Sequence, residues 1–136
     1  IKGSHLVIDR KINRAYMFEA ICNKRYIFAL PYKNNTLLGT TEKRTDTPDT
    51  PIIDEDEKDY LIQSYNSFFS EQISSENILY SYSGVRPLIK STKKNFHNSS
   101  RDFYIDQNKK LICVFGGKWT TAPSIAKKIV TIINNG

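Results

Sequence analysis

The chain has 136 residues, of which 39% are hydrophobic and 12% aromatic, and this composition excludes a disordered tail. No apolar stretch approaches the roughly 20 residues of a membrane-spanning helix. The length is that of a single domain, so we predict one globular domain over residues 1–136. The net charge is +6, but fourteen of the twenty basic residues are lysines, often in scattered pairs, so we expect no dedicated nucleic-acid function.

The first forty residues predict an antiparallel meander. Residues 3–8 are a short apolar run, and two aromatic-rich runs over 16–21 and 25–30 are joined by a turn at 22–24. A fourth strand is predicted over 36–40. These strands follow one another too closely for crossover helices, so we expect antiparallel pairing.

A helix is predicted to begin near Asp54, because this residue can cap it and Glu57 lies three residues further on. One face of this helix is apolar and is expected to pack on the sheet. It carries Leu61, Tyr65, Phe68 and Phe69. We interpret the helix as structural and assign it no chemistry.

The rest of the chain predicts a strand over 78–88, a polar surface loop over 90–100 and a hairpin made of 103–105 and 111–115. A closing helix has Pro123 in its first turn, where proline is tolerated. It carries Ile125, Ile129, Ile132 and Ile133 on one side. The fold class is therefore α+β, an antiparallel sheet with flanking helices.

The two cysteines, Cys22 and Cys113, each lie in an apolar stretch and are not part of a CxxC pair. We expect two reduced core thiols in a cytoplasmic protein. His5 and His97 complete a set of ligands too small for a structural zinc site, so we predict no metal.

Three short motifs, SGVRPL, SRDF and FGGKWTT, present the positive charges of Arg86, Arg101 and Lys118 from a stiff or glycine-lined backbone. Pro87 favours an extended backbone at Arg86. Guanidinium groups grip phosphate or carboxylate through two parallel hydrogen bonds, so the set suits a small phosphorylated or carboxylated substrate.

Other interpretations stay open. Arg86 and Arg101 could be buried ion-pair partners of carboxylates such as Asp102. The chain could be a stand-alone module that binds a phosphorylated metabolite or an acidic tail, or the remnant of a decayed enzyme, in either case without redox chemistry. It could also be a small RNA-binding domain, whose binding would fall steeply with salt.

The segments GSH, FALPY, LLGTTE, YSGVRPL, SRDF and VFGGKWTT occur in the same order as in FAD-dependent glycerol-3-phosphate dehydrogenases, which the chain resembles from residue 3 to about 128. That family belongs to the flavoproteins related to D-amino acid oxidase. They pair a Rossmann-type FAD domain with an antiparallel-sheet substrate domain, and this chain resembles the second part. The resemblance implies oxidation of sn-glycerol 3-phosphate to dihydroxyacetone phosphate, with hydride transfer to FAD and electrons passed onward to quinone.

The resemblance also implies roles for individual residues. Arg86 and Arg101 would bind the substrate phosphate, and Lys118 would add a positive charge near flavin or substrate. His5 would accept the hydroxyl proton, although a hydrogen-bonded strand histidine is the alternative. The flavin edge would be contacted by Gly116, Gly117, Thr120 and Thr121. A second wall of the substrate pocket would come from Thr40 and Thr41.

The chain departs from the family pattern in three places. It has SRDF where the family has TRDY and GTTE where the family has GTTD, and its closing helix lacks the aromatic residue and the arginine of the family's TTYRKLAE. Its six glycines also give no GxGxxG fingerprint, which a dinucleotide-binding fold needs at a helix N-terminus. We therefore expect a missing FAD-binding domain, no tightly bound FAD and no activity in this piece alone. The complete enzyme would be peripheral on the cytoplasmic membrane.

Overall fold

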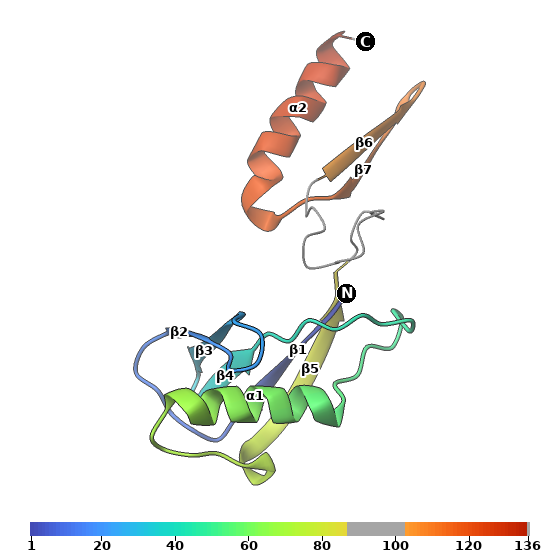
Figure 1. The fold of residues 1–136 in the computed structure, drawn as a ribbon. Helices are drawn as coiled ribbons and strands as arrows, with labels where there is room; N and C mark the ends of the chain where they lie inside the picture. The colour runs from blue at the N-terminus through green and yellow to red at the C-terminus, as the bar shows by residue number, and fades with distance from the viewer. Residues whose placement is uncertain (87–102, 136) are drawn as a thin grey trace. The chain divides into compact units, whose positions relative to one another are not determined.

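The computed structural model describes residues 1–86 and 103–135, and the chain divides into two compact units after Arg86. The first unit contains a five-stranded sheet and the helix α1, and the second contains a hairpin and the helix α2 (Figure 1). The assignment of residues 1–136 to one domain stays a prediction.

The sheet of the first unit is antiparallel throughout, with strand order β2-β3-β4-β1-β5. Its strands are β1 (Lys2–Ile8), β2 (Tyr16–Glu19), β3 (Tyr26–Tyr32), β4 (Asn35–Gly39) and β5 (Ile78–Val85). The predicted antiparallel pairing is thus confirmed, and β2, β3 and β4 form a meander, but β1 pairs with β4 instead of β2, and β5 joins the sheet on the free side of β1. Because of this order, β1 lies between two strands that are distant from each other in sequence.

The third strand continues beyond residue 30, where the predicted run ended. Pro31 lies inside β3 and pairs with Thr36 of β4. It lies beyond Ala29, the last β3 residue that pairs with β2, so its missing amide hydrogen costs no bond to that neighbour.

The helix α1 (Glu55–Phe68) covers one face of the sheet (Figure 1). Its predicted start is confirmed, because Asp54 is the N-cap and forms a capping box with Glu57. The Glu57 backbone N–H donates to Asp54 Oδ1 at 3.1 Å, and the Asp54 N–H donates to Glu57 Oε2 at 3.1 Å. A short 3-10 turn, η1 (Ser75–Asn77), then leads into β5.

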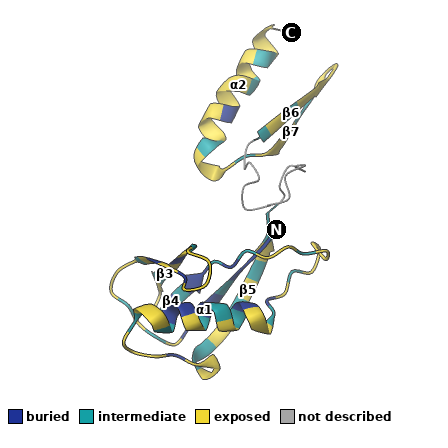
Figure 2. Cartoon of the chain, viewed as in Figure 1, coloured by how far each residue is buried: buried dark blue, intermediate teal, exposed yellow. Residues whose placement is uncertain are grey.

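The core of this unit lies between α1 and the sheet, where Figure 2 shows buried residues on both elements. It includes Leu6, Ile8, Phe18, Ala20, Ile27, Ala29, Leu38, Ile53, Leu61, Tyr65 and Ile73. Strand residues alternate in direction, so every second side chain of β1, β3 and β4 enters this core. Phe68, predicted to pack on the sheet, stacks on Phe18 at 4.8 Å between ring centroids but stays half exposed.

The opposite face of the sheet carries large side chains that α1 does not cover. Five of them are 41–58% exposed: Met17, Tyr26, Phe28, Tyr80 and Tyr82. This aromatic face contains the alternate residues of the same strands whose other residues form the core.

The second unit comprises β6 (Phe103–Asn108), β7 (Leu111–Gly116), the 3-10 turn η3 (Trp119–Thr121) and α2 (Ala122–Asn135). β6 and β7 form the predicted hairpin, longer at the first strand than expected, and Pro123 lies in the first turn of α2 as predicted. On α2, Ile125 is buried, but Ile133 is 61% exposed, so the predicted apolar stripe is narrower than expected.

Both cysteines are free thiols, as predicted, but their position differs from the prediction. Cys22 is exposed in the β2–β3 turn, and Cys113 is half-buried in β7, so neither is a fully buried core residue.

Candidate functional site

The predicted site residues of the first unit meet where β1, β4 and β5 lie side by side. His5 of β1 is opposite Gly39 of β4 on one side and Tyr82 of β5 on the other. Its imidazole stacks on the Tyr82 ring, with centroids 5.0 Å apart and planes 11° apart. A side chain at Gly39 would collide with the His5 ring, so the glycine of LLGTTE makes room for it.

Arg86 follows β5 and reaches across the end of β1. Its backbone is held by Ile1, since the Arg86 N–H donates to Ile1 O at 2.8 Å and the Ile1 backbone nitrogen donates to Arg86 O at 3.0 Å. The guanidinium donates from Nη2 to Thr40 Oγ1 at 3.0 Å. It lies over Gly3, where any side chain would collide with it. The glycine of GSH is therefore explained by the position of Arg86.

Glu42 supplies a carboxylate to Arg86, at 3.5 Å from Nη1, and its other oxygen pairs with Arg25. Its side chain is only 6% exposed. The alternative interpretation of Arg86 as an ion-pair partner is thus realised, with Glu42 as the carboxylate. Asp102, suggested as such a partner, and Arg101, suggested as a second phosphate ligand, both lie outside the described residues.

Electrostatics around His5 favour the neutral ring. Burial lowers the pKa of His5, and the positive charge of Arg86 lowers it further. Among the described residues, Nδ1 is buried without a hydrogen-bond partner. A neutral imidazole at neutral pH is able to take up a proton, which a general base requires.

Thr40 and Thr41 are predicted to form one wall of the pocket, but their side chains point to opposite sides of the backbone. Thr40 contacts Arg86, as described above, whereas Thr41 is buried toward α1. The Thr41 hydroxyl donates to Glu57 Oε1 at 2.6 Å and accepts from the Ser4 N–H at 2.9 Å. The structure therefore brings Thr40, but not Thr41, to the side of the sheet that holds His5.

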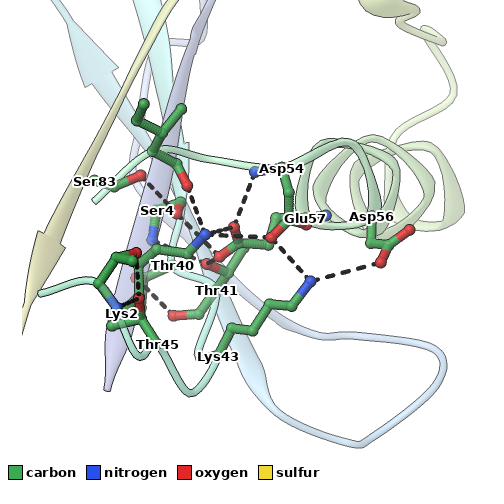
Figure 3. A network of polar contacts seen from close by, with 12 residues as sticks. Lys2, Ser4, Thr40, Thr41, Lys43, Thr45, Asp54, Asp56, Glu57 and Ser83 are labelled. Carbon is green, nitrogen blue, oxygen red and sulfur yellow. Dashed lines mark hydrogen bonds and ion pairs between the residues drawn. The ribbon is translucent and has the colours of Figure 1, made fainter. Parts of the chain in front are cut away.

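Figure 3 shows the polar network to which Thr41 belongs. Glu57 reaches from α1 toward β1, and its two oxygens contact Ser4, Thr41 and Lys2. This network was not predicted from the sequence, which indicated a purely structural helix. A signal was present, because the alternate positions of β1 that point toward α1 begin with the polar Lys2 and Ser4 and only then become apolar.

A pocket of about 300 Å³ opens on the helix side of the same segment. It has mixed charge, with basic and acidic side chains on its wall. Its lining residues are Asn23, Arg25, Thr41, Glu42, Lys43, Asp56, Glu57 and Tyr60. Thr41 is the one lining residue of this pocket that was predicted to bind substrate or cofactor.

The second unit holds the residues predicted to contact flavin. Gly116 and Gly117 have positive φ angles of 76° and 92°, which favour glycine. A side chain at Gly117 would collide with Ile125, because a Cβ atom there would lie 2.8 Å from Ile125 Cδ1. The Thr121 hydroxyl lies 3.0 Å from both the backbone nitrogen and the carbonyl oxygen of Lys118.

The residues of this unit that are predicted to contact flavin differ in exposure and in local role. Gly117 and Thr121 have roles in local packing and in the η3 turn, whereas Gly116, Lys118 and Thr120 are exposed. The exposed three are accessible to a ligand, as contact with a flavin ring would require, and their flavin contact stays a prediction. We derive no chemical step from this unit.

In the described parts of the chain, no group of three or more metal-ligating side chains occurs. None of the helices found in residues 1–86 and 103–135 is long and apolar enough to cross a membrane.

The antiparallel sheet with a helix on one face is an α+β fold, and comparison with known proteins shows that this fold is of the flavoprotein type. Residues 1–132 match the family described as FAD dependent oxidoreductase, and the chain belongs to this family.

Similar proteins include the aerobic glycerol-3-phosphate dehydrogenase of Escherichia coli (strain K12), 36% identical over 93% of this chain and 27% of that protein. The D-erythritol 1-phosphate dehydrogenase of Brucella abortus (strain 2308) is 36% identical over 94% of this chain and 27% of its own length. The structure of glycerol-3-phosphate dehydrogenase from Bacillus halodurans complexed with FAD matches with a TM-score of 0.76 and 28% identity, over 99% of this chain and 26% of that one. The chain thus spans about a quarter of the length of these relatives.

Proposed function

We propose that this chain is the substrate-binding part of a flavoprotein that oxidises sn-glycerol 3-phosphate to dihydroxyacetone phosphate. FAD, held by another part of the protein, supplies the hydride acceptor, and the electrons continue to a quinone at the cytoplasmic membrane. The proposal is supported by the family of the chain and by the names of its relatives.

The observation that carries the proposal is the meeting of His5 and Arg86. These residues are 81 positions apart in sequence, yet the arginine is close enough to lower the pKa of the histidine. A phosphate bound by Arg86 would place a three-carbon substrate beside the imidazole. His5 would then take the hydroxyl proton while the carbon of the secondary alcohol loses hydride and becomes a ketone.

Arg86 also supports this chemistry indirectly. Its positive charge disfavours a protonated imidazole, so His5 stays able to accept a proton near neutral pH. Binding of a phosphate dianion would partly neutralise that charge and raise the basicity of His5 when substrate is present. Thr40 and Glu42 hold the guanidinium at the end of β1, where this coupling acts.

The test compares binding of sn-glycerol 3-phosphate and of glycerol to the chain, to Arg86→Gln and to Arg44→Gln. Arg44 is the matched control because its side chain is 81% exposed and lies in a loop. We expect preference for the phosphate ester in the parent chain and in Arg44→Gln, and about a tenfold or greater loss in Arg86→Gln, since hydrogen bonds to charged groups contribute about 1.5–3 kcal/mol. An unchanged preference in Arg86→Gln would contradict the phosphate assignment.

The flavin assignment has a separate test. We expect the purified chain to show no stoichiometric flavin absorbance, because it lacks the GxGxxG fingerprint. Phosphate preference without flavin, even after the rest of the protein is supplied, would instead support a phosphometabolite-binding module without redox chemistry.

A further inference from the structure

The side of the sheet that faces α1 carries a polar residue directly beside each part of the proposed site. Ser4 lies between Gly3 and His5, and Ser83 lies between Tyr82 and Gly84. Neighbouring residues of a strand point to opposite faces, so a contact that fixes the serine also fixes the backbone of the site residue next to it.

The same relation holds where β4 ends. Thr41 points toward α1, while the preceding residue, Thr40, contacts the Arg86 guanidinium. The backbone of this segment is tied to β1 as well, because the Thr41 N–H donates to Ser4 O at 3.1 Å. Two neighbouring backbones beneath the site are therefore connected through Ser4 and Thr41.

Glu57 joins these groups from the first turn of α1 (Figure 3). Its Oε1 accepts from Thr41 Oγ1 at 2.6 Å and from Ser4 Oγ at 3.0 Å, and Ser4 Oγ lies 2.8 Å from Ser83 Oγ. The carboxylate thus contacts β1 and the end of β4 directly and reaches β5 through Ser4.

The charge of Glu57 is compensated inside the same network. Lys2 Nζ lies 2.6 Å from Glu57 Oε2 and 3.2 Å from Asp54 Oδ2, and it donates to Ile52 O at 2.6 Å. Glu57 is 4% and Lys2 6% exposed. A buried carboxylate whose two oxygens have four partners has few alternative positions, which makes it a rigid anchor.

We propose that Glu57 is a positioning residue that holds His5, Thr40 and Arg86 in the geometry of the site, although it contacts none of them. The role of these three residues as a substrate site rests on the proposed function, but the coupling between Glu57 and these residues does not. Without the carboxylate, the hydroxyls of Ser4 and Thr41 lose their shared acceptor and the strands beneath the site lose their common anchor.

The experiment introduces Glu57→Gln into the 136-residue chain and reads the site by NMR. The amide conserves shape, but it turns a donor NH2 either toward Lys2 Nζ and the Asp54 N–H or, if it flips, toward the two hydroxyls, and it removes the charge that compensates Lys2. Two controls separate positioning from stability. Glu55→Gln makes the same charge change at an exposed residue of the same turn, and Leu61→Val weakens the core one turn further along the helix.

The readouts are the His5 ring resonances and their pH titration, assigned with a His97→Gln variant, and hydrogen exchange at the Thr41 and Arg86 amides. We expect Glu57→Gln to move the midpoint of the His5 titration. We also expect hydrogen exchange at both amides to be about tenfold faster in Glu57→Gln than in Leu61→Val, which corresponds to the loss of one hydrogen bond. Glu55→Gln should leave both unchanged.

If Glu57→Gln affects His5 and the two amides no more than Leu61→Val does, the carboxylate is only a stability element and the proposal is overturned. Phosphate binding does not enter this comparison. A chain without phosphate preference would therefore refute the proposed function and leave the coupling intact.

Discussion

The two faces of the five-stranded sheet differ most where β1, β4 and β5 meet. On the face toward α1, Lys2, Ser4, Thr41 and Glu57 are buried and engaged with one another. On the opposite face, the half-exposed Tyr82 stacks on a partly buried His5. One face therefore buries its polar groups in a connected network, whereas the other leaves its rings partly exposed to solvent.

This division predicts that substitutions on the two faces have different effects. Changes on the helix side should lower the free energy of unfolding, and a change at Glu57 should in addition alter the site on the opposite face. Changes on the open face should alter titration and binding while the fold persists.

The largest effect is expected in the apolar core under α1. Leu61 is fully buried, so Leu61→Ala should lower the free energy of unfolding by about 2–5 kcal/mol, because it loses apolar contacts and leaves a cavity. Urea denaturation measures the change. Ile52→Ala is the control, since Ile52 is 75% exposed and should change stability by only about 0.5 kcal/mol or less.

The polar part of the same face should be almost as sensitive. Lys2→Met would leave Glu57 buried without its cation, and we expect a loss of about 3 kcal/mol in the same denaturation experiment. Lys58→Met removes a lysine whose partner, Glu55, is exposed, and should cost about 0.5 kcal/mol or less. Equal losses in the two variants would show that the Lys2–Glu57 pair has no special role.

Asp54 links this face to pH. Burial raises its pKa, but hydrogen bonds from Lys43, from the Glu57 backbone and from Lys2 outweigh this and lower it to about 2, against 3.8 ordinarily. The unfolded chain therefore binds more protons in this range, and stability is lost as pH falls from about 4 toward 2.

Because the Asp54 side chain is 38% exposed, solvent screening reduces the expected contribution to about 1 kcal/mol. Asp54→Asn, which still caps the helix, should flatten this part of the stability–pH curve. The exposed Asp59→Asn should leave the decline in place. A decline of the same size in Asp54→Asn would assign it to another carboxyl group.

The open face gives the smallest effect on stability and a clear one on titration. The folded pKa of His5 is lowered, so the folded state binds fewer protons and its contribution is lost as pH falls below about 6.5. Tyr82→Ala would uncover the ring, so we expect the pKa of His5 to rise in an NMR titration. The loss of stacking should cost on the order of 0.5–1 kcal/mol.

Tyr104→Ala is a control for that titration, because Tyr104 is an exposed tyrosine of the second unit. An unchanged pKa of His5 in Tyr82→Ala would show that the stacked ring does not shield the imidazole. The contrast between the two faces would then need another explanation.

Local patterns were sufficient for much of the fold. Closely spaced apolar runs predicted the antiparallel strands, and the spacing of Asp54 and Glu57 predicted the start of α1, because hairpins and capping boxes are formed by residues near one another in sequence. The predicted run ended at residue 30, whereas β3 continues through Pro31, since the tolerance of a proline depends on whether its strand has a neighbour at that point.

The amino-acid sequence by itself determined the strands, the helix start and the motifs that indicated the family. Only the tertiary structure decided the partners of the site residues: Glu42 beside Arg86, Tyr82 against His5, and Glu57 beneath Ser4 and Thr41. These pairs are 15 or more residues apart, and most are more than 40. Their contact depends on strand order and register, which local propensity and spacing do not encode.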